Sequence, residues 1–482
     1  MDKIIFALIV AFSFVLRFLP LGQRDFWYDE AYTGNLIRLS WQKLVPVLAS
    51  DVHPPLYFIL LKLYAAVLGD GVMVLRSFSV LWGVAAVAVV YGISKELFDR
   101  KTAVYASLLA ALSPFLIQYS DEARMYSQYA FFILIATWFF IRFQRSGRLL
   151  HALGWGISLG LASLTHYMAF MFAPCFLLMQ FVWGEWSFKK IRHLFAGVVT
   201  AVLMFIFWIP AFVYQLSRSS ETLNGLGVVT FSRIFLIAQI FFLGMPRGEL
   251  SATDLLAGNT FSHIPSSLVF WGVGACLVAM TLFALIKEKR KALMIVILSW
   301  GFLLLAYALV FLDKLFLYPR YVIPAAYFFC ILFAVALRYS SRWIVGGFCI
   351  VYGVLLLSIV PLQNSQGYGL LKRDLARYSD AHFYNLNTFD YMIAKYYLGG
   401  PEYVTLYNVG WPQYDSRSWP GMGQETKRTE RFEDIKEDPK ALVILNVQLP
   451  LKLRDDRYFD ATPFDLVAKY QNIEVYRYRG AR

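Results

Sequence analysis

Residues 4–32 read IIFALIVAFSFVLRFLPLGQRDFWYDEAY, an apolar run followed by an aromatic stretch that contains two adjacent carboxylates. The run from Ile4 to Leu21 is long enough for a membrane-spanning helix, and Asp29 and Glu30 follow where such a helix leaves the hydrocarbon. Ionisable groups at this depth are costly, so their presence predicts a function. No small-x-small cleavage site follows the run, which favours a retained span over a cleaved signal peptide.

The composition of the whole chain is typical of a membrane protein. Of its 482 residues, 59% are hydrophobic and only 16% are charged, whereas soluble proteins carry about 25% charged residues. The sequence predicts an all-α polytopic membrane domain over residues 1–361. Eleven candidate spans lie at about 4–21, 72–94, 103–119, 127–143, 149–165, 167–184, 194–212, 266–286, 292–311, 321–337 and 343–361.

Basic residues indicate how these spans are oriented. They gather in alternate short loops, at residues 95–101, 142–148, 189–192, 287–291 and 338–342. The positive-inside rule makes these loops cytoplasmic, with the N-terminus inside and the C-terminal segment outside a cytoplasmic (inner) membrane. The same pattern explains the net charge of +13 without nucleic acid as a partner. The four cysteines lie in apolar segments and show no disulfide framework or metal-ligand spacing: Cys175, Cys276, Cys330 and Cys349.

Two further apolar stretches, Pro54 to Gly69 and Phe231 to Met245, do not fit the charge pattern as spans. We interpret both as interfacial or re-entrant helices on the outer face. The alternative, in which both cross the membrane, preserves the parity of the spans but places Lys62 and Arg233 in hydrocarbon.

The composition changes after Pro361. Residues 362–482 are rich in charged residues and Tyr and contain no further span. Strand patterns appear at 381–386, 402–407 and 441–447, with a hairpin at 464–470 and 473–478. Thr388 is a suitable N-cap for a helix that reaches Leu398 before Gly399-Gly400. We expect a small extracytoplasmic α/β domain without a recognisable catalytic signature.

Two outer-face motifs lie early in the chain, and each has two interpretations. Near an apolar, aromatic boundary, Asp29 can hold a raised pKa and act as a base, or it can cap the N-terminus of an amphipathic helix. In the stretch Asp51-Val52-His53-Pro54-Pro55-Leu56-Tyr57, His53 or the helix N-terminus after it can bind a phosphate. The alternative is a polar loop in which two prolines begin a helix.

Two more motifs follow at outer ends of predicted spans. In Ser120-Asp121-Glu122-Ala123-Arg124-Met125-Tyr126, Arg124 can place two donors on a phosphate while Asp121 or Glu122 orients it or holds a sugar hydroxyl; the alternative is a solvated turn. In Leu317-Tyr318-Pro319-Arg320-Tyr321, Arg320 is either a second phosphate clamp or an aromatic-belt anchor. His166-Tyr167 is a weaker motif of the same kind. For Arg17 and Arg76, the default interpretation is snorkelling to the interface.

Taken together, these motifs resemble the GT-C superfamily of polyprenyl-phosphate-sugar glycosyltransferases, and in particular the protein O-mannosyltransferases and the lipid A aminoarabinose transferases. Asp29-Glu30 matches the mannosyltransferase Asp-Glu, and residues 51–56 are similar to their Asp-x-His-Pro-Pro-Leu segment. Residues 122–126 resemble the E-A-R-x-Y pattern of bacterial members, and residues 318–321 resemble their Arg-Tyr start to a late span. The likeness covers residues 1 to about 340, whereas the tail differs from that of the mannosyltransferases.

The resemblance implies a polyprenyl-phosphate-linked sugar as donor and a protein, lipid or glycan hydroxyl as acceptor. Asp29 is then the base of a single inverting displacement, and His53, Arg124 and Arg320 hold the phosphate. Glu30, Asp121 and Glu122 position hydroxyls, with Tyr126, His166 and Tyr321 as further binding residues. Some relatives bind a divalent metal, which Asp29 with Asp121 could hold here; we assign no metal ligand.

Two other functions compete with the transferase. A transporter or flippase of lipid-linked sugars would place its ionisable groups near the bilayer midplane in repeated halves. Here they gather at outer ends and no internal repeat is evident. An enzyme similar to the O-antigen ligases would differ in its donor, a diphosphate-linked oligosaccharide. The absence of a G-x-x-x-x-G-K-[ST] loop argues against a nucleotide-hydrolysing machine.

Overall fold

The structure of the protein is a computed structural model, in which the chain forms two compact units. The first unit comprises residues 1–21, 53–57 and 76–362, and the second comprises residues 22–52, 58–75 and 363–482. The residues described are 2–183, 186–223, 237–238, 240–241, 266–311, 318–359, 367–378, 380–385, 388–399, 404–407, 428–429, 432–446 and 464–479. The second unit therefore combines the first outer loop of the predicted topology with the C-terminal segment.

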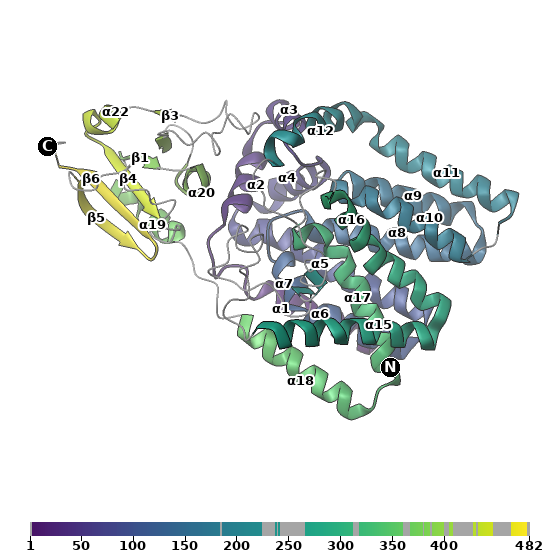
Figure 1. The fold of residues 1–482 in the computed structure, drawn as a ribbon. Helices are drawn as coiled ribbons and strands as arrows, with labels where there is room; N and C mark the ends of the chain where they lie inside the picture. The colour runs from purple at the N-terminus through teal and green to yellow at the C-terminus, as the bar shows by residue number, and fades with distance from the viewer. Residues whose placement is uncertain are drawn as a thin grey trace. The chain divides into compact units, whose positions relative to one another are not determined.

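The first unit is helical (Figure 1). Its helices are α1 (Asp2–Phe18), α5 (Val72–Leu97), α6 (Arg100–Leu112), α7 (Pro114–Ser120), α8 (Tyr126–Ser146), α9 (Leu149–Ser163), η1 (Tyr167–Met171), α10 (Phe172–Trp183), α11 (Phe188–Phe205), η2 (Ile206–Trp208), α12 (Ile209–Leu223), α15 (Ser266–Val296), η3 (Ile297–Gly301), α16 (Phe302–Phe311), η4 (Pro319–Val322), α17 (Ile323–Tyr339) and α18 (Arg342–Ile359). At its centre lies α17, which is buried from Ile323 to Leu337 and packs against α6 and α15. A helix that is apolar and buried on all sides forms the core of such a bundle.

Several helices are long and apolar enough to cross a membrane, although the predicted number of eleven stays a prediction. Within the described ranges, five helices are long and apolar enough to cross a bilayer, and the bent pair α6–α7 makes a sixth. Shorter apolar helices lie at Leu56–Leu68, Leu149–Ser163 and Tyr167–Trp183. Helix α15 breaks at Lys289, whose φ is 39°, within the loop predicted at 287–291.

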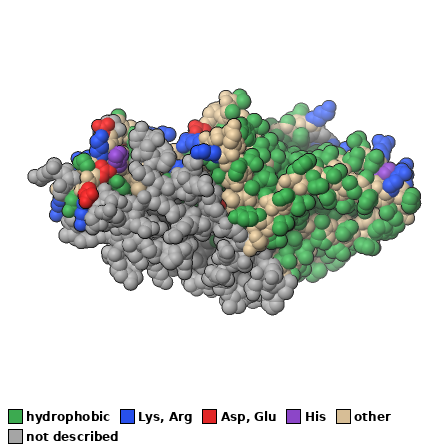
Figure 2. All heavy atoms as spheres, turned by 90° about the horizontal axis from the view of Figure 1, so that it is seen from above, with side chains coloured by type: hydrophobic (Ala, Val, Ile, Leu, Met, Phe, Trp, Pro, Cys, Tyr) green, Lys and Arg blue, Asp and Glu red, His purple; other side chains and the backbone are tan. Residues whose placement is uncertain are grey.

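Large apolar side chains cover the surface of this helical unit. Figure 2 shows hydrophobic side chains spread over it with Lys and Arg toward its ends. On α11 and η2 the exposed fractions reach 83% at Phe188 and 91% at Phe207. Exposed apolar area on this scale is unusual for a soluble surface and matches contact with lipid. The chain is therefore a multi-pass membrane protein.

The second unit contains helices α2 (Tyr28–Arg38), α3 (Trp41–Ser50), α19 (Tyr368–Arg373), η6 (Leu375–Tyr378), α20 (Thr388–Leu398) and α22 (Phe432–Glu437). Its sheet consists of β1 (His382–Asn385), β2 (Val404–Tyr407), β3 (Arg428–Thr429), β4 (Ala441–Asn446), β5 (Phe464–Tyr470) and β6 (Ile473–Tyr478). Helix α4 (Leu56–Leu68) runs from one unit into the other, as does α5.

The sheet has the order β3-β2-β1-β4-β6-β5. Strands β3, β2, β1 and β4 pair in parallel with one another, for example with Phe383 opposite Val404 and Leu442. The hairpin β5–β6 joins the edge of β4 antiparallel. The predicted strands, the hairpin and the helix from Thr388 to Leu398 are confirmed, because alternating side chains and turn residues specify them locally.

Two sequence interpretations change in the structure, and the first of the two apolar stretches outside the predicted spans forms a helix. Helix α2 begins at Tyr28 after the N-cap residue Trp27, so Asp29 lies inside the first turn and is not the cap. The snorkelling interpretation of Arg17 and Arg76 is wrong, because both side chains are fully buried. The stretch Pro54 to Gly69 does form a helix, α4, while most of Phe231 to Met245 lies outside the described residues.

Candidate functional site

Three of the predicted motifs in the first unit lie just before the N-terminus of a helix, and a fourth lies in a short helix that leads into one. His53 precedes α4, Arg124 precedes α8, His166 precedes η1, and Arg320 lies in η4 just before α17. Unbonded N–H groups and the helix dipole make each of these ends electropositive. An imidazole or a guanidinium group at such an end can donate hydrogen bonds to a bound anion.

Hydrogen bonds and ring contacts bring these four ends together. Arg124 Nη2 lies 3.2 Å from His53 Nε2. The ring of His166 lies 5.2 Å from that of Tyr321 and 6.2 Å from that of Tyr126. The Arg320 guanidinium carbon lies 5.7 Å from the centres of the Tyr126 and Tyr321 rings. Within the first unit, the motifs chosen from sequence therefore form one cluster.

The segment that carries His53 is fixed to two other parts of this cluster. Leu56 N donates to Leu164 O at 3.0 Å, which ties the start of α4 to the turn before His166. Tyr57 Oη shares a 2.9 Å hydrogen bond with Ser79 Oγ, which in turn donates to Arg124 O at 3.1 Å. The two prolines before Leu56 pre-set the backbone for the helix start, so the position of His53 is held firmly.

The loop with Arg124 is buried, which overturns the interpretation as a solvated turn. Asp121, Glu122 and Arg124 are exposed by only 1%, 5% and 2%. Burying charged groups is expensive unless they are bonded or used. The loop also makes a tight turn, in which Arg124 N donates to Glu122 O at 2.7 Å. Three charges held at this depth favour a functional role.

A helix break and a buried arginine place this loop. Helices α6 and α7 meet at 60° across Ser113-Pro114, because a proline cannot continue the preceding helix. The carbonyls that the break leaves open are bound by Arg17, which donates to Ala110 O and Ala111 O, both at 2.9 Å. Arg17 also donates to Ser120 Oγ at 3.2 Å, at the end of α7 directly before Asp121.

His166 is a buried titratable group of the cluster, with an exposed fraction of 7%. Burial lowers the pKa of His166 well below its ordinary value, and electrostatic interactions with His53, Arg124 and Arg320 lower it further. The ring is therefore neutral near pH 7. Its Nδ1 accepts from Met168 N at 3.2 Å, which leaves the proton on Nε2. A neutral donor beside the guanidinium groups of Arg124 and Arg320 is an arrangement that suits an anion.

Tyr129 belongs to this cluster but was not predicted from the sequence. Its ring stacks on His166 at 5.0 Å, and its hydroxyl is buried without a hydrogen-bond partner in the part of the chain that the structure describes. The signal was available, since Tyr126 and Tyr129 lie three residues apart and so share a helix face. Tyr57 and Ser79 were also missed, because their role depends on a contact between separate helices.

Asp29 and Glu30 lie in the second unit, in the first turn of α2, where the helix dipole favours negative charge. Glu30 is fully buried, accepts from Trp27 N at 3.4 Å and lies 3.9 Å from Arg24 Nη1. Asp29 is only half-buried, and its backbone carbonyl accepts from Thr33 Oγ1 at 2.9 Å. Of the two carboxylates, Asp29 is therefore the more exposed.

The described residues contain no group of three His, Cys, Asp or Glu side chains placed to hold a metal ion. The three cysteines described, Cys175, Cys276 and Cys330, are free thiols. A metal bound by Asp29 and Asp121 stays a prediction.

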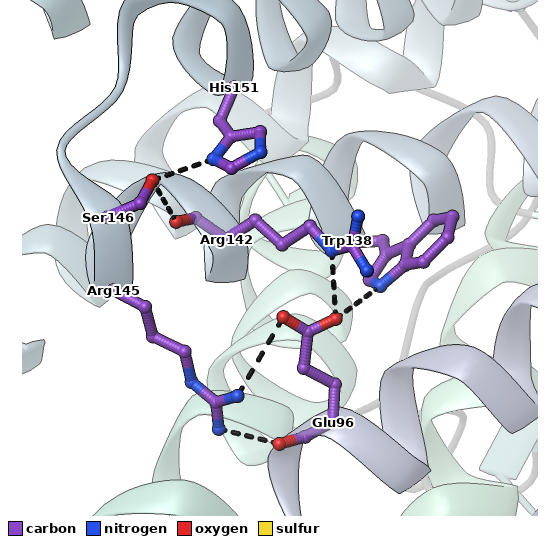
Figure 3. Close-up of polar contacts among 6 residues, drawn as sticks. All are labelled: Glu96, Trp138, Arg142, Arg145, Ser146 and His151. Atoms are coloured by element: carbon purple, nitrogen blue, oxygen red, sulfur yellow. Dashed lines mark hydrogen bonds and ion pairs between the residues drawn. The ribbon is translucent and has the colours of Figure 1, made fainter.

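A second polar cluster joins helix ends in the loops predicted to be cytoplasmic (Figure 3). Glu96 Oε2 accepts from Trp138 Nε1 at 2.6 Å and from Arg142 Nε at 3.0 Å. Arg145 donates to Glu96 O at 2.6 Å, and the Arg142 guanidinium lies 4.3 Å from the Trp138 ring centre. Every group in the cluster binds a neighbour, so we interpret it as a clamp between α5 and α8 rather than a reactive site.

Comparison with known proteins agrees with the predicted resemblance. Residues 52–213 match the family model described as dolichyl-phosphate-mannose-protein mannosyltransferase. A curated protein of Bacillus subtilis (strain 168), the putative mannosyltransferase YkcB, is 26% identical over 147 residues, which are 30% of this chain and 20% of that protein. The chain thus spans about a fifth of the length of that relative.

Two solved structures share the fold over most of the chain. ArnT from Cupriavidus metallidurans bound to undecaprenyl phosphate has a TM-score of 0.63 at 16% identity, covering 98% of this chain and 97% of ArnT. The oligosaccharyltransferase of Archaeoglobus fulgidus has a TM-score of 0.55 at 13% identity, covering 93% and 70%. The resemblance to the GT-C superfamily is confirmed.

Proposed function

We propose that this chain, whose motifs and fold are those of the GT-C superfamily of glycosyltransferases, transfers a sugar from a polyprenyl-phosphate donor to an acceptor hydroxyl. The observation that carries the proposal is the cluster of His53, Arg124 and Arg320 at converging helix N-termini. Such a cluster binds a phosphate and stabilises the charge that develops on it as it leaves. The phosphate-linked donor of the related proteins supplies that group.

The chemistry needs a base as well as an anion site, and Asp29 is the residue proposed for it. Asp29 takes the proton of the acceptor hydroxyl while the hydroxyl oxygen forms a bond to the anomeric carbon. The bond from that carbon to the phosphate oxygen breaks, and its electron pair leaves with the lipid phosphate. A single displacement of this kind inverts the anomeric configuration.

The remaining predicted residues would bind substrate. Glu30, Asp121 and Glu122 would hold sugar or acceptor hydroxyls. The rings of Tyr126 and Tyr321 would pack on the sugar, with the neutral His166 as a donor. The proposed location is the outer face of the cytoplasmic membrane, with a protein, a lipid or a glycan as the acceptor. The exposed apolar surface of the helical unit accommodates the bilayer from which a polyprenyl chain would enter.

The decisive experiment incubates the purified protein with a panel of polyprenyl-phosphate sugars and follows the release of polyprenyl phosphate by mass spectrometry. Asp29→Asn should abolish release, while expression and thermal stability stay at the wild-type level. Asp465→Asn is the matched control, because Asp465 is an exposed carboxylate whose partner is the surface residue Arg479. Wild-type release by the Asp29 variant would overturn the base assignment.

The anion site has a separate test. Arg124→Met should weaken binding of free polyprenyl phosphate by about 10- to 100-fold, because a charge-assisted bidentate contact is lost. Arg142→Met, which removes an arginine from the clamp around Glu96, should bind as the wild type does. Movement of intact lipid-linked sugar across vesicles, without any release of polyprenyl phosphate, would instead favour a transporter.

A further inference from the structure

The helix that carries Asp29 and Glu30 is attached to the C-terminal segment on its N-terminal side. The Asp25 carboxylate accepts from Gly367 N at 2.8 Å and from Gly369 N at 3.1 Å. A side chain at Gly369 would place its Cβ only 2.7 Å from Asp25 Oδ1, so the close approach requires glycine. Next along the chain, Phe26 N donates to Tyr397 Oη at 2.9 Å.

The same helix is attached again on its C-terminal side. A Cβ at Gly34 would lie 2.6 Å from Tyr396 Cε2, which shows that the Tyr396 ring lies directly on the α2 backbone. Asn35 Nδ2 donates to Met392 O at 3.0 Å, and Arg38 Nη1 donates to Tyr396 O at 2.8 Å. Asp29 and Glu30 thus lie between two sets of contacts made with the C-terminal segment.

Helix α20 is the common partner in most of these contacts. From Tyr391 to Leu398 every side chain is buried, with exposed fractions of 8% or less. A helix buried on all sides must pack on more than one surface, and α20 packs against β1 and β2 of the sheet as well as against α2. The sheet therefore fixes α20, and α20 fixes α2.

We propose that α20 is a positioning element for catalysis, and that Tyr397 and Asn35 are positioning residues for Asp29. The inference rests on the proposed function of Asp29 as the base. Neither residue touches substrate; each sets the backbone of α2 near the carboxylate. The C-terminal segment is accordingly part of the transferase machinery and not an independent appendage.

The test uses full-length protein with the double variant Tyr397→Phe/Asn35→Ala, which removes one hydrogen bond on each side of the pair. We expect kcat to fall by about tenfold or more, because small misplacement of a base is costly to the rate. The KM for the donor should stay within about twofold, since the phosphate site is untouched. The control is Tyr476→Phe, which removes a tyrosine hydroxyl bonded to Glu474 in the same sheet.

A second measurement separates positioning from general destabilisation and does not depend on activity. Amide hydrogen exchange of residues 28–34 should accelerate in the double variant, while the amides of β4 and β6 stay protected as in the wild type. Unchanged kcat or unchanged exchange of α2 would overturn the inference. If Asp29→Asn keeps wild-type activity, the proposed base fails, whereas the exchange experiment still decides whether α20 holds α2.

Discussion

Arg17 offers the sharpest test of how the first unit holds its anion cluster. Its guanidinium is fully buried and donates to Ala110 O and Ala111 O, the two carbonyls exposed by the break between α6 and α7. In Arg17→Ala each carbonyl loses a charge-assisted partner, and a buried unsatisfied carbonyl costs about 1–3 kcal/mol. The variant also avoids the cost of burying the charged guanidinium, and this offsets part of the loss in stability. The expected net destabilisation is about 3 kcal/mol.

Thermal stability in detergent, followed by size-exclusion chromatography, measures this effect. A loss of about 3 kcal/mol should lower Tm by roughly 5 °C or more in a protein of this size. The Tm of Arg17→Lys should lie between those of the wild type and Arg17→Ala, because one ammonium group cannot replace the several donors of the planar guanidinium. The control Arg192→Ala removes an exposed arginine from α11. If Arg17→Ala melts with the wild type, the carbonyls are satisfied in another way and the reasoning is wrong.

Arg17→Ala should also weaken polyprenyl-phosphate binding, because the same guanidinium holds Ser120 at 3.2 Å just before the loop with Arg124. Gly83 offers an independent route to the same contact. A Cβ at Gly83 would lie 2.4 Å from Ser120 Oγ, so Gly83→Ala should displace Ser120 without removing any charge. Both variants should lower affinity for the phosphate, and normal affinity in Gly83→Ala would show that Ser120 does not set the loop.

Three further predictions concern other parts of the molecule. Burial raises the pKa of Asp438, but hydrogen bonds from His382, Lys440 N and Tyr384 outweigh it and lower the pKa overall. Asp438→Asn should therefore lower the free energy of unfolding by about 1 kcal/mol at pH 7. The difference between variant and wild type should shrink below about pH 4, as the wild-type carboxylate protonates. Melting curves between pH 3 and 7, at intervals of roughly one unit, would show it, and an unchanging difference would contradict it. Gly156→Ala places a Cβ 2.1 Å from Gly197 O and should destabilise the α9–α11 contact by about 1–3 kcal/mol, measured as a lower Tm; an unchanged Tm would mean that these helices separate freely. Glu96→Gln should destabilise the protein by about 1 kcal/mol, and the difference in Tm from the wild type should be smaller at high salt. A difference in Tm that is the same at low and high ionic strength would argue against a charge-based clamp.

Local signals were sufficient for much of the secondary structure. The hairpin at 464–478 and the helix from Thr388 to Leu398 match their predictions, because alternation in the strands and Gly399 after the helix specify them within a few residues. The apolar runs predicted helices, whereas the bend at Pro114, within the predicted span 103–119, was not predicted. Arg17 was misread, because snorkelling is the default for an arginine near a span end, whereas its acceptors lie on a helix more than ninety residues away.

The amino-acid sequence alone determined that this is a membrane protein, which motifs carry charge, and which superfamily it resembles, because hydropathy and short motifs are properties of neighbouring residues. Only the tertiary structure decided that His53, Arg124, His166 and Arg320 form one cluster, since their helices meet through packing and not through sequence proximity. It also decided that the stretch around Asp29 packs with the C-terminal sheet domain. That association depends on the buried faces of α2 and α20 fitting together, and no local pattern encodes such a fit.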